Sequence, residues 1–247
     1  MRSDGRAWNE LRPLRITRGY LKYSDGSALV EAGDTRVLCT ANLEDKTPAF
    51  LKGTSHGWVT AEYGMLPGST PTRSQREASK GRPGGRTFEI QRLIGRSLRA
   101  VVDLAALGER TLWVDCDVIQ ADGGTRTASI TGAFVAVVEA LDKARQRGVV
   151  QGLPVRDFLA ATSAGIVEDT LLLDLAYDED SRARVDMNLV MTGGGHVVEI
   201  QSSGEGAPFS LTEMERLISL AREGIASIID AEKAVLGPLA LEIGRGG

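Results

Sequence analysis

Hydrophobic and polar positions alternate in two different rhythms along this chain, and each rhythm fills a block of sequence. Over residues 14–44, short alternating runs are broken at Ser24-Asp25-Gly26 and Ala32-Gly33-Asp34, which predicts antiparallel strands joined by hairpin turns. Over residues 88–107, apolar positions recur every three or four residues, which predicts an amphipathic helix. The chain therefore begins with a strand meander and continues into a helix.

The remaining residues repeat this order. The patterns predict strands at 57–63, 112–119, 158–167, 171–175, 184–192 and 196–202, and helices at 130–147 and 211–236. Ser210 or Thr212 is a candidate cap of the last helix, and Gly193-Gly194-Gly195 predicts a hairpin turn. Strands grouped in hairpins with helices between the groups favour an α+β fold, in two similar β-rich halves. Because no linker separates the halves, we expect one domain over residues 1–247.

The composition is that of an ordinary globular chain, with 42% hydrophobic and 25% charged residues. Cys39 and Cys116 both lie in apolar, strand-like runs. We expect them to be buried free thiols in the reducing cytoplasm. The sequence has no apolar run of membrane-spanning length, so we expect no membrane contact.

Charge is distributed unevenly, although the formal net charge is only −4. Residues 72–99 hold eight basic and two acidic residues, whereas residues 168–186 hold seven acidic and two basic ones. A basic and an acidic stretch in one chain suggest a polyanion together with a metal ion. They are equally compatible with complementary surfaces in an oligomer.

A glycine-rich turn at Asp122-Gly123-Gly124-Thr125-Arg126-Thr127 joins a predicted strand to a predicted helix. Unpaired amides at a helix start attract anions, glycines allow close approach of the backbone, and arginine suits phosphate oxygens. The turn therefore predicts a phosphate site. The alternative is a plain turn in which Thr125 or Thr127 caps the helix.

A second turn, Gly84-Gly85-Arg86, leads into the helix predicted at 88–107. A cation near a helix N-terminus opposes the helix dipole, and a bound anion would offset that cost. Arg86 is therefore a second candidate phosphate ligand. The alternative is a flexible basic surface loop.

Two carboxylates, Asp180 and Asp186, flank a short acidic turn. Such a pair suits Mg²⁺ (or Mn²⁺), and one member could protonate a leaving oxygen. The alternative is a solvated turn whose acids pair with Arg182 and Arg184. A further basic set suits a phosphodiester chain or, alternatively, a contact between subunits: Arg73, Arg76, Lys80 and Arg82 in the loop, and Arg92, Arg96 and Arg99 on one helix face.

Taken together and in order, these motifs resemble the ribonuclease PH family. The resemblance is carried by Arg2-Ser3-Asp4-Gly5-Arg6, Leu11-Arg12-Pro13, Gly33-Asp34-Thr35-Arg36, residues 84–99, residues 122–128, Asp180, Asp186-Met187-Asn188, Glu199-Ile200-Gln201 and Gly204-Glu205. It implies the family's fold and a homohexameric ring, a trimer of dimers. It also implies a phosphate-dependent 3′-to-5′ exoribonuclease that trims tRNA precursors and other RNA, releases nucleoside diphosphates and can run in reverse.

The resemblance also implies roles for the candidate residues. Inorganic phosphate would be the co-substrate, held by Arg86, Gly124, Thr125 and Arg126. Asp180 and Asp186 would bind the metal or supply the acid, and Arg73 and Arg76 would contact RNA or a neighbouring subunit. An alternative function is a non-catalytic, RNA-binding ring subunit of an exosome-like assembly.

Overall fold

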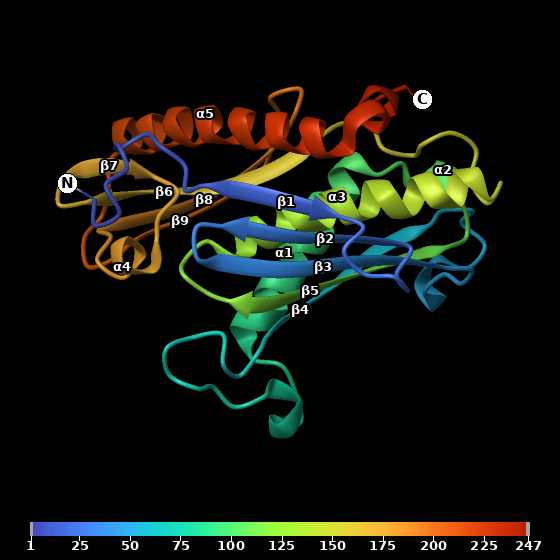
Figure 1. Cartoon of the computed structure of the whole chain (residues 1–247), viewed down its shortest axis with the longest axis horizontal. Helices are drawn as coiled ribbons and strands as arrows, with labels where there is room; N and C mark the ends of the chain where they lie inside the picture. The colour runs from blue at the N-terminus through green and yellow to red at the C-terminus, as the bar shows by residue number, and fades with distance from the viewer. Residues whose placement is uncertain (1, 246–247) are drawn as a thin grey trace.

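The structure is a computed structural model that describes residues 2–245, apart from the side chains of Ala78 and Lys80. It contains two β-sheets and five α-helices, and the helices lie between or after groups of strands along the chain, which defines an α+β fold. Figure 1 shows the sheets side by side, with the long helix α5 (Leu211–Leu236) running along one side of the molecule over both halves. The predicted fold class is confirmed.

The first sheet has five strands in the order β1-β2-β3-β5-β4. Its pairs are antiparallel except β4 with β5, which run parallel. The turn at Gly33 joins β2 to β3 as predicted, with Ala32 opposite Thr35. The strands are β1 (Leu14–Arg18), β2 (Gly26–Ala32), β3 (Thr35–Glu44), β4 (Trp58–Met65) and β5 (Thr111–Gln120).

The second sheet has four antiparallel strands in the order β7-β6-β8-β9. Its central strand β6 is buried along its whole length, because two helices, over residues 125–146 and 211–236, pack against it. The predicted triple-glycine hairpin joins β8 to β9. The strands are β6 (Leu159–Val167), β7 (Thr170–Leu173), β8 (Val185–Thr192) and β9 (Val197–Gly204).

The helices pack between and over the sheets. The central helix α3 contacts β2 and β3 on one side and β6 on the other, so most of its positions are buried. Helix α5 begins at the predicted cap: the Ser210 hydroxyl accepts from the Glu213 amide, and Glu213 reaches back to Ser210. The helices are α1 (Gly85–Val101), α2 (Leu104–Leu107), α3 (Thr125–Gln146), α4 (Tyr177–Asp180) and α5 (Leu211–Leu236), with 3-10 turns at Ala49–Leu51, Glu77–Lys80 and Gly237–Glu242.

Strand ends agree with the predictions to within two residues, and three helical features differ by more. The helix predicted over 88–107 is broken, because Val102 is extended and pairs with Val155, and Asp103 then caps α2. Helix α3 begins at Thr125, five residues before the predicted start. Helix α4 lies inside the acidic stretch for which no helix was predicted.

The core forms where α3 faces the first sheet. Gly132 of α3 lies so close to Cys39 that a Cβ there would be 2.7 Å from its Sγ, which explains a glycine inside this helix. Cys39 and Cys116 are opposite each other on neighbouring strands, and both are buried and unpaired as disulfides, as predicted. Among the described residues, no helix combines the length and apolar character needed to cross a membrane.

Candidate active site

A cleft of about 650 Å³ opens where the two halves meet. The end of β4, the loop after it and the first turns of α1 and α3 form one side, and α4 and β8 form the other. The predicted site residues that line it are Arg86, Gly124, Thr125, Arg126, Asp180 and Asp186. The structure therefore brings the phosphate candidates and the acidic pair, which are far apart in sequence, into one cavity.

The two glycines of the turn line the cleft with their backbone atoms. Gly123 and Gly124 have φ angles of 75° and 63°, a left-handed conformation that favours glycine. Gly124 precedes α3, and no side chain caps the helix there. The Thr127 hydroxyl instead donates to the Gly124 carbonyl, at 2.9 Å. The capping alternative is therefore wrong, and the first-turn amides are available to an anion.

Gly123 also fixes the distance between the two walls of the cleft. A Cβ on this residue would lie 2.6 Å from the Leu175 carbonyl oxygen and 2.8 Å from the Tyr177 amide nitrogen. Only a residue without a side chain allows the turn to contact the start of α4 in this way. This contact places the phosphate candidates beside the helix that carries Asp180.

Thr125 has a buried partner that the sequence did not reveal. Its Oγ1 lies 2.9 Å from the Tyr63 hydroxyl, and both residues are buried. Tyr63 comes from β4, in the register position opposite Cys116 of β5. When the tyrosine donates to this Oγ1, the threonine proton is free to point at an anion in the cleft.

The two candidate arginines are held differently. The side chain of Arg126 is 20% exposed, and its Nη1 donates to Gln201 Oε1 at 2.8 Å. The Glu89 carboxylate is 3.6 Å from the same nitrogen. Arg86 is exposed in the first turn of α1, where its Nη1 contacts the sulfur of Met65 at 4.0 Å. Arg86 therefore has the freedom to move onto a ligand that Arg126 already faces.

The acidic pair has perturbed proton affinities. Burial raises the pKa of Asp186 from 3.8 to about 6, the neighbouring Asp180 adds to the rise, and Arg126 opposes it. Desolvation also raises the pKa of Asp180, against the opposing charges of Arg126 and Arg86. The Oδ1 atom of Asp186 is buried without a hydrogen-bond partner. A poorly solvated carboxylate with an unpartnered oxygen suits a proton donor or a ligand of a hard cation.

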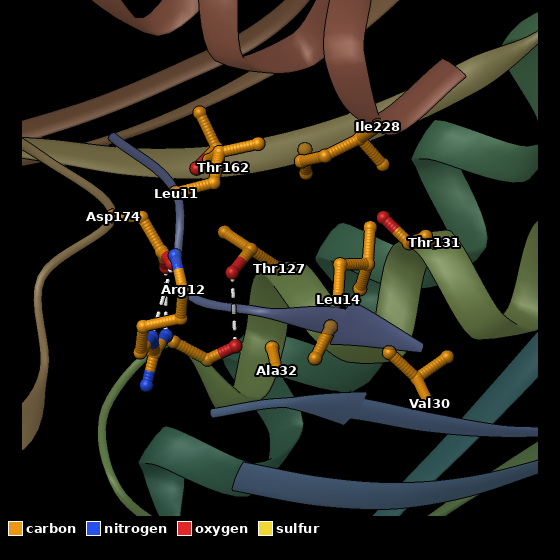
Figure 2. Close-up of a pocket in the computed structure, with 13 residues that line it drawn as sticks. Leu11, Arg12, Leu14, Val30, Ala32, Thr127, Thr131, Thr162, Asp174 and Ile228 are labelled. Atoms are coloured by element: carbon orange, nitrogen blue, oxygen red, sulfur yellow. Dashed lines mark hydrogen bonds and ion pairs between the residues drawn. The ribbon is translucent and has the colours of Figure 1, made fainter. Parts of the chain in front are cut away.

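Arg12 ties the two walls together, a role that sequence reasoning did not assign. Figure 2 shows Arg12 facing Asp174, to which its Nη2 and Nε donate at 2.7 and 3.0 Å. Its Nη1 donates to the carbonyl oxygen of Asp122, in the glycine turn. Burial would raise the pKa of Asp174, but the Arg12 guanidinium outweighs burial and holds it below the ordinary value. Beside this ion pair, a cavity of about 30 Å³ has room for about one water molecule.

Two more arginines anchor α4 from the N-terminal segment. Arg2 makes a two-pronged ion pair with Glu179 of α4, with both N–O distances 2.7 Å. Arg2 and Arg6 also donate to the Asp174 carbonyl, at 2.9 and 3.1 Å. Both arginine side chains are almost fully buried. The first motif of the sequence therefore holds the helix that carries Asp180.

The basic set is divided by the fold. Arg73 and Arg76 are exposed in the segment between β4 and α1, which projects from the body in Figure 1. Arg92 is exposed on α1. Arg96 pairs with Glu199 at 2.7 Å, and Arg99 donates to the Val59 carbonyl with its guanidinium over the Trp58 ring. Lys80 ends the 3-10 turn in this segment, and its side chain lies outside the described part of the structure.

An α+β fold with an anion cleft opposite two carboxylates is typical of a phosphoryl-transfer enzyme that relies on positioning and charge. Comparison with known proteins agrees with this class. Residues 10–141 match domain 1 of the 3′ exoribonuclease family, and residues 157–224 match domain 2. The chain belongs to the 3′ exoribonuclease family.

Individual relatives support the same relationship. The chain is 57% identical over 246 residues to ribonuclease PH of Moorella thermoacetica, covering 100% of this chain and 98% of that protein. The fold is similar to rice (Oryza sativa) Rrp46, with a TM-score of 0.78, 22% identity and coverage of 96% of this chain and 100% of that one. It is also similar to a chain of the Archaeoglobus fulgidus exosome with RNA bound to the active site, with a TM-score of 0.80, 24% identity and coverage of 93% and 91%.

Proposed function

We propose that the protein is a phosphate-dependent 3′-to-5′ exoribonuclease, which transfers the terminal nucleotide of RNA to inorganic phosphate. The observation that carries this proposal is one cleft that holds Thr125, Arg126 and Arg86 opposite Asp180 and Asp186. The family membership and the full-length similarity to a ribonuclease PH support it.

The proposed reaction needs no nucleophilic side chain, because phosphate itself attacks. A phosphate oxygen forms a bond to the phosphorus of the last phosphodiester, and the bond from that phosphorus to the preceding O3′ breaks. The nucleoside diphosphate leaves, and the freed O3′ takes up a proton. The chain must hold two mutually repelling anions in line, which two arginines, a hydroxyl and open helix amides can do. The product retains a phosphoanhydride bond, so the reaction can run in reverse.

Asp180 and Asp186 fit both roles expected of them. With a pKa of about 6, Asp186 holds a proton in part of the molecules near neutrality, and its carboxyl group, which lines the cleft, can deliver that proton to O3′. Alternatively, when both are ionised, the same two carboxylates would hold Mg²⁺ (or Mn²⁺), two protein ligands being enough when substrate phosphates supply others. When bound, the ion would neutralise charge on the reacting phosphates.

The finer features of the proposal concern the substrate and the assembly. We propose that tRNA precursors are among the RNAs trimmed, that six copies form a ring as a trimer of dimers, and that the protein works in the cytoplasm as one domain with duplicated halves. Arg73, Arg76 and Arg92 are exposed and suit either the RNA backbone or a neighbouring subunit. The ring-forming alternative without catalysis is weaker, because the phosphate arginines and the acidic pair are all present in the cleft.

The decisive experiment is RNA decay with and without inorganic phosphate, with the products resolved. We expect decay only with phosphate, and nucleoside diphosphates as products. Equal decay in its absence, or monophosphate products, would indicate a hydrolytic nuclease. RNA binding without shortening would favour the non-catalytic subunit.

Arginine variants test the phosphate site itself. Removing Arg86 or Arg126 deletes a charge-assisted hydrogen bond to phosphate, so either alanine variant should raise the KM for phosphate by about 10–100-fold. Circular dichroism should show an unchanged fold. Wild-type phosphate dependence in either variant would contradict the site assignment.

A further inference from the structure

A row of polar side chains runs from α1 across β9 to the phosphate arginine. Arg96 of α1 pairs with Glu199 of β9, with distances of 2.7 Å (Nε to Oε2) and 3.1 Å (Nη2 to Oε1). Gln201, two residues further on β9, donates from Nε2 to Glu199 Oε1 at 3.2 Å. Its Oε1 then accepts from Arg126 Nη1 at 2.8 Å. The row thus joins three elements and both halves of the molecule.

The charges at its two ends fix the orientation of the Gln201 amide. A carboxylate accepts only, so it must receive the NH₂ end of the amide, and a guanidinium donates only, so it must face the oxygen end. A flipped amide would set oxygen against oxygen and nitrogen against nitrogen. Because residues two apart on a strand lie on the same face, Glu199 and Gln201 are neighbours by geometry.

A neutral partner has a chemical advantage at this position. A carboxylate bound directly to Arg126 would orient it equally well, but it would compete with the phosphate for the same cation. The amide orients the guanidinium and leaves its charge for the ligand. The Glu199 carboxylate holds the amide of Gln201 and does not bind Arg126 itself. Arg96 neutralises the charge of Glu199. The Glu89 carboxylate is further away, at 3.6 Å, and half exposed, so water screens its charge.

We propose that Gln201 is a positioning residue for Arg126, and that the Arg96–Glu199 ion pair sets the direction of its amide. This inference rests on the proposed function, because it assumes that Arg126 binds the attacking phosphate. It gives Arg96 a role inside the protein and not at the RNA. It also gives the Glu199-Ile200-Gln201 motif, and the strand β9 that carries it, a part in phosphate binding.

Variants at Gln201 separate orientation from charge. Gln201→Met keeps the side-chain length and removes the hydrogen bonds, so it should raise the KM for phosphate by about 3–10-fold. Gln201→Glu places a competing charge on Arg126 and should raise it by about 10–100-fold. Gln146→Glu is the matched control, since Gln146 also donates to a carboxylate (that of Asp142) but lies at the far end of α3, on the order of 30 Å from Arg126. It should leave the KM for phosphate unchanged.

Arg96→Met tests the outer end of the row. It leaves Glu199 unneutralised near the site, so it should raise the KM for phosphate while the KM for RNA stays the same. The opposite pattern, a changed KM for RNA with an unchanged KM for phosphate, would overturn the role given to Arg96.

A direct binding measurement distinguishes the failure of this inference from the failure of the proposed function. The dissociation constant of inorganic phosphate is measured by calorimetry on the full-length wild type and on each variant, beside the kinetics. Weaker phosphate binding in both Gln201 variants, with Gln146→Glu like wild type, supports the inference. If wild type requires and binds phosphate but the Gln201 variants do so equally well, the inference is wrong and the proposed function stands. If wild type neither binds nor uses phosphate, both are wrong.

Discussion

Replacing Asp186 with asparagine should make the protein more stable and less active at the same time. Asp186 is largely buried, one of its carboxylate oxygens has no partner, and its pKa is raised from 3.8 to about 6. Above pH 6 the folded protein must therefore hold a charge in an environment that disfavours it. Asparagine has the same shape without the charge, so the variant escapes this cost.

The size of the effect follows from the pKa difference. A shift of about two pKa units corresponds to about 2–3 kcal/mol of destabilisation of the folded state by the ionised Asp186. For a raised carboxyl pKa the folded protein binds the proton more tightly than the unfolded chain. Its stability is therefore lost as the pH rises from about 4 to about 6, and the loss is constant above that range. In a chain of this length the variant should gain about 5–10 °C in Tm at pH 8.

The assay is thermal unfolding of wild type and Asp186→Asn from pH 4 to pH 8, at fixed protein concentration because assembly affects Tm. The gain in Tm should be small near pH 4 and grow up to about pH 6, while phosphorolysis falls by orders of magnitude at every pH. Asp178→Asn is the matched control, because Asp178 is an exposed aspartate in the neighbouring helix α4 and its carboxylate pairs with Arg182 at the surface. A gain that does not vary with pH, or no gain at all, would refute the reasoning.

Three further predictions concern the surroundings of the cleft. Tyr63→Phe removes the hydrogen-bond partner of the Thr125 hydroxyl and should raise the KM for phosphate by about 3–10-fold; in a Thr125→Val background it should have no further effect, and a full additional loss would show that Tyr63 acts elsewhere. Gly123→Ala should abolish activity and lower Tm, because its methyl group would contact the backbone at the start of α4 and strain a left-handed residue; Gly53→Ala, also left-handed but with open space, should lower Tm much less and leave the reaction unchanged. Glu232 of α5 is fully buried with both carboxylate oxygens unpartnered, and burial raises its pKa well above the ordinary value, so Glu232→Gln should raise Tm increasingly as the pH rises; an equal or lower Tm at pH 8 would show that the carboxylate is solvated.

The elements with regular patterns were predictable from the sequence. Helix α5 has strong three-and-four periodicity and a complete capping box, and its predicted bounds, 211–236, are those of the structure. The hairpins at Gly33 and at the triple glycine were predictable because their turn residues fix the geometry locally. The start of α3 was not, because Thr125, Thr127 and Ser129 favour a turn by themselves and are helical here in a buried environment.

The residues of the candidate site were predictable from the sequence, but the side chains that surround them and bind to them were not. Glycines beside arginines and a pair of aspartates indicate phosphate and metal chemistry through residue type alone, and the structure places them in one cleft. The partners of these residues carry no local signal. Tyr63 and Gln201 lie 62 and 75 positions from the residues they contact. Arg12 is 110 residues from the turn that it holds.

The sequence by itself determined the strand and helix blocks, the two glycine turns and the kinds of charge that converge, because these depend on neighbours along the chain. Only the tertiary structure decided which charged side chains are exposed to a ligand and which are held in ion pairs within the protein. Arg86 remains exposed for a ligand while Arg96 is paired with Glu199, although both are arginines on one helix. Asp186 has a pKa near 6 while Asp174 has a lowered one, because one is buried beside a like charge and the other beside Arg12. Burial and long-range pairing set these differences, and both exist only after the two halves have packed around α3.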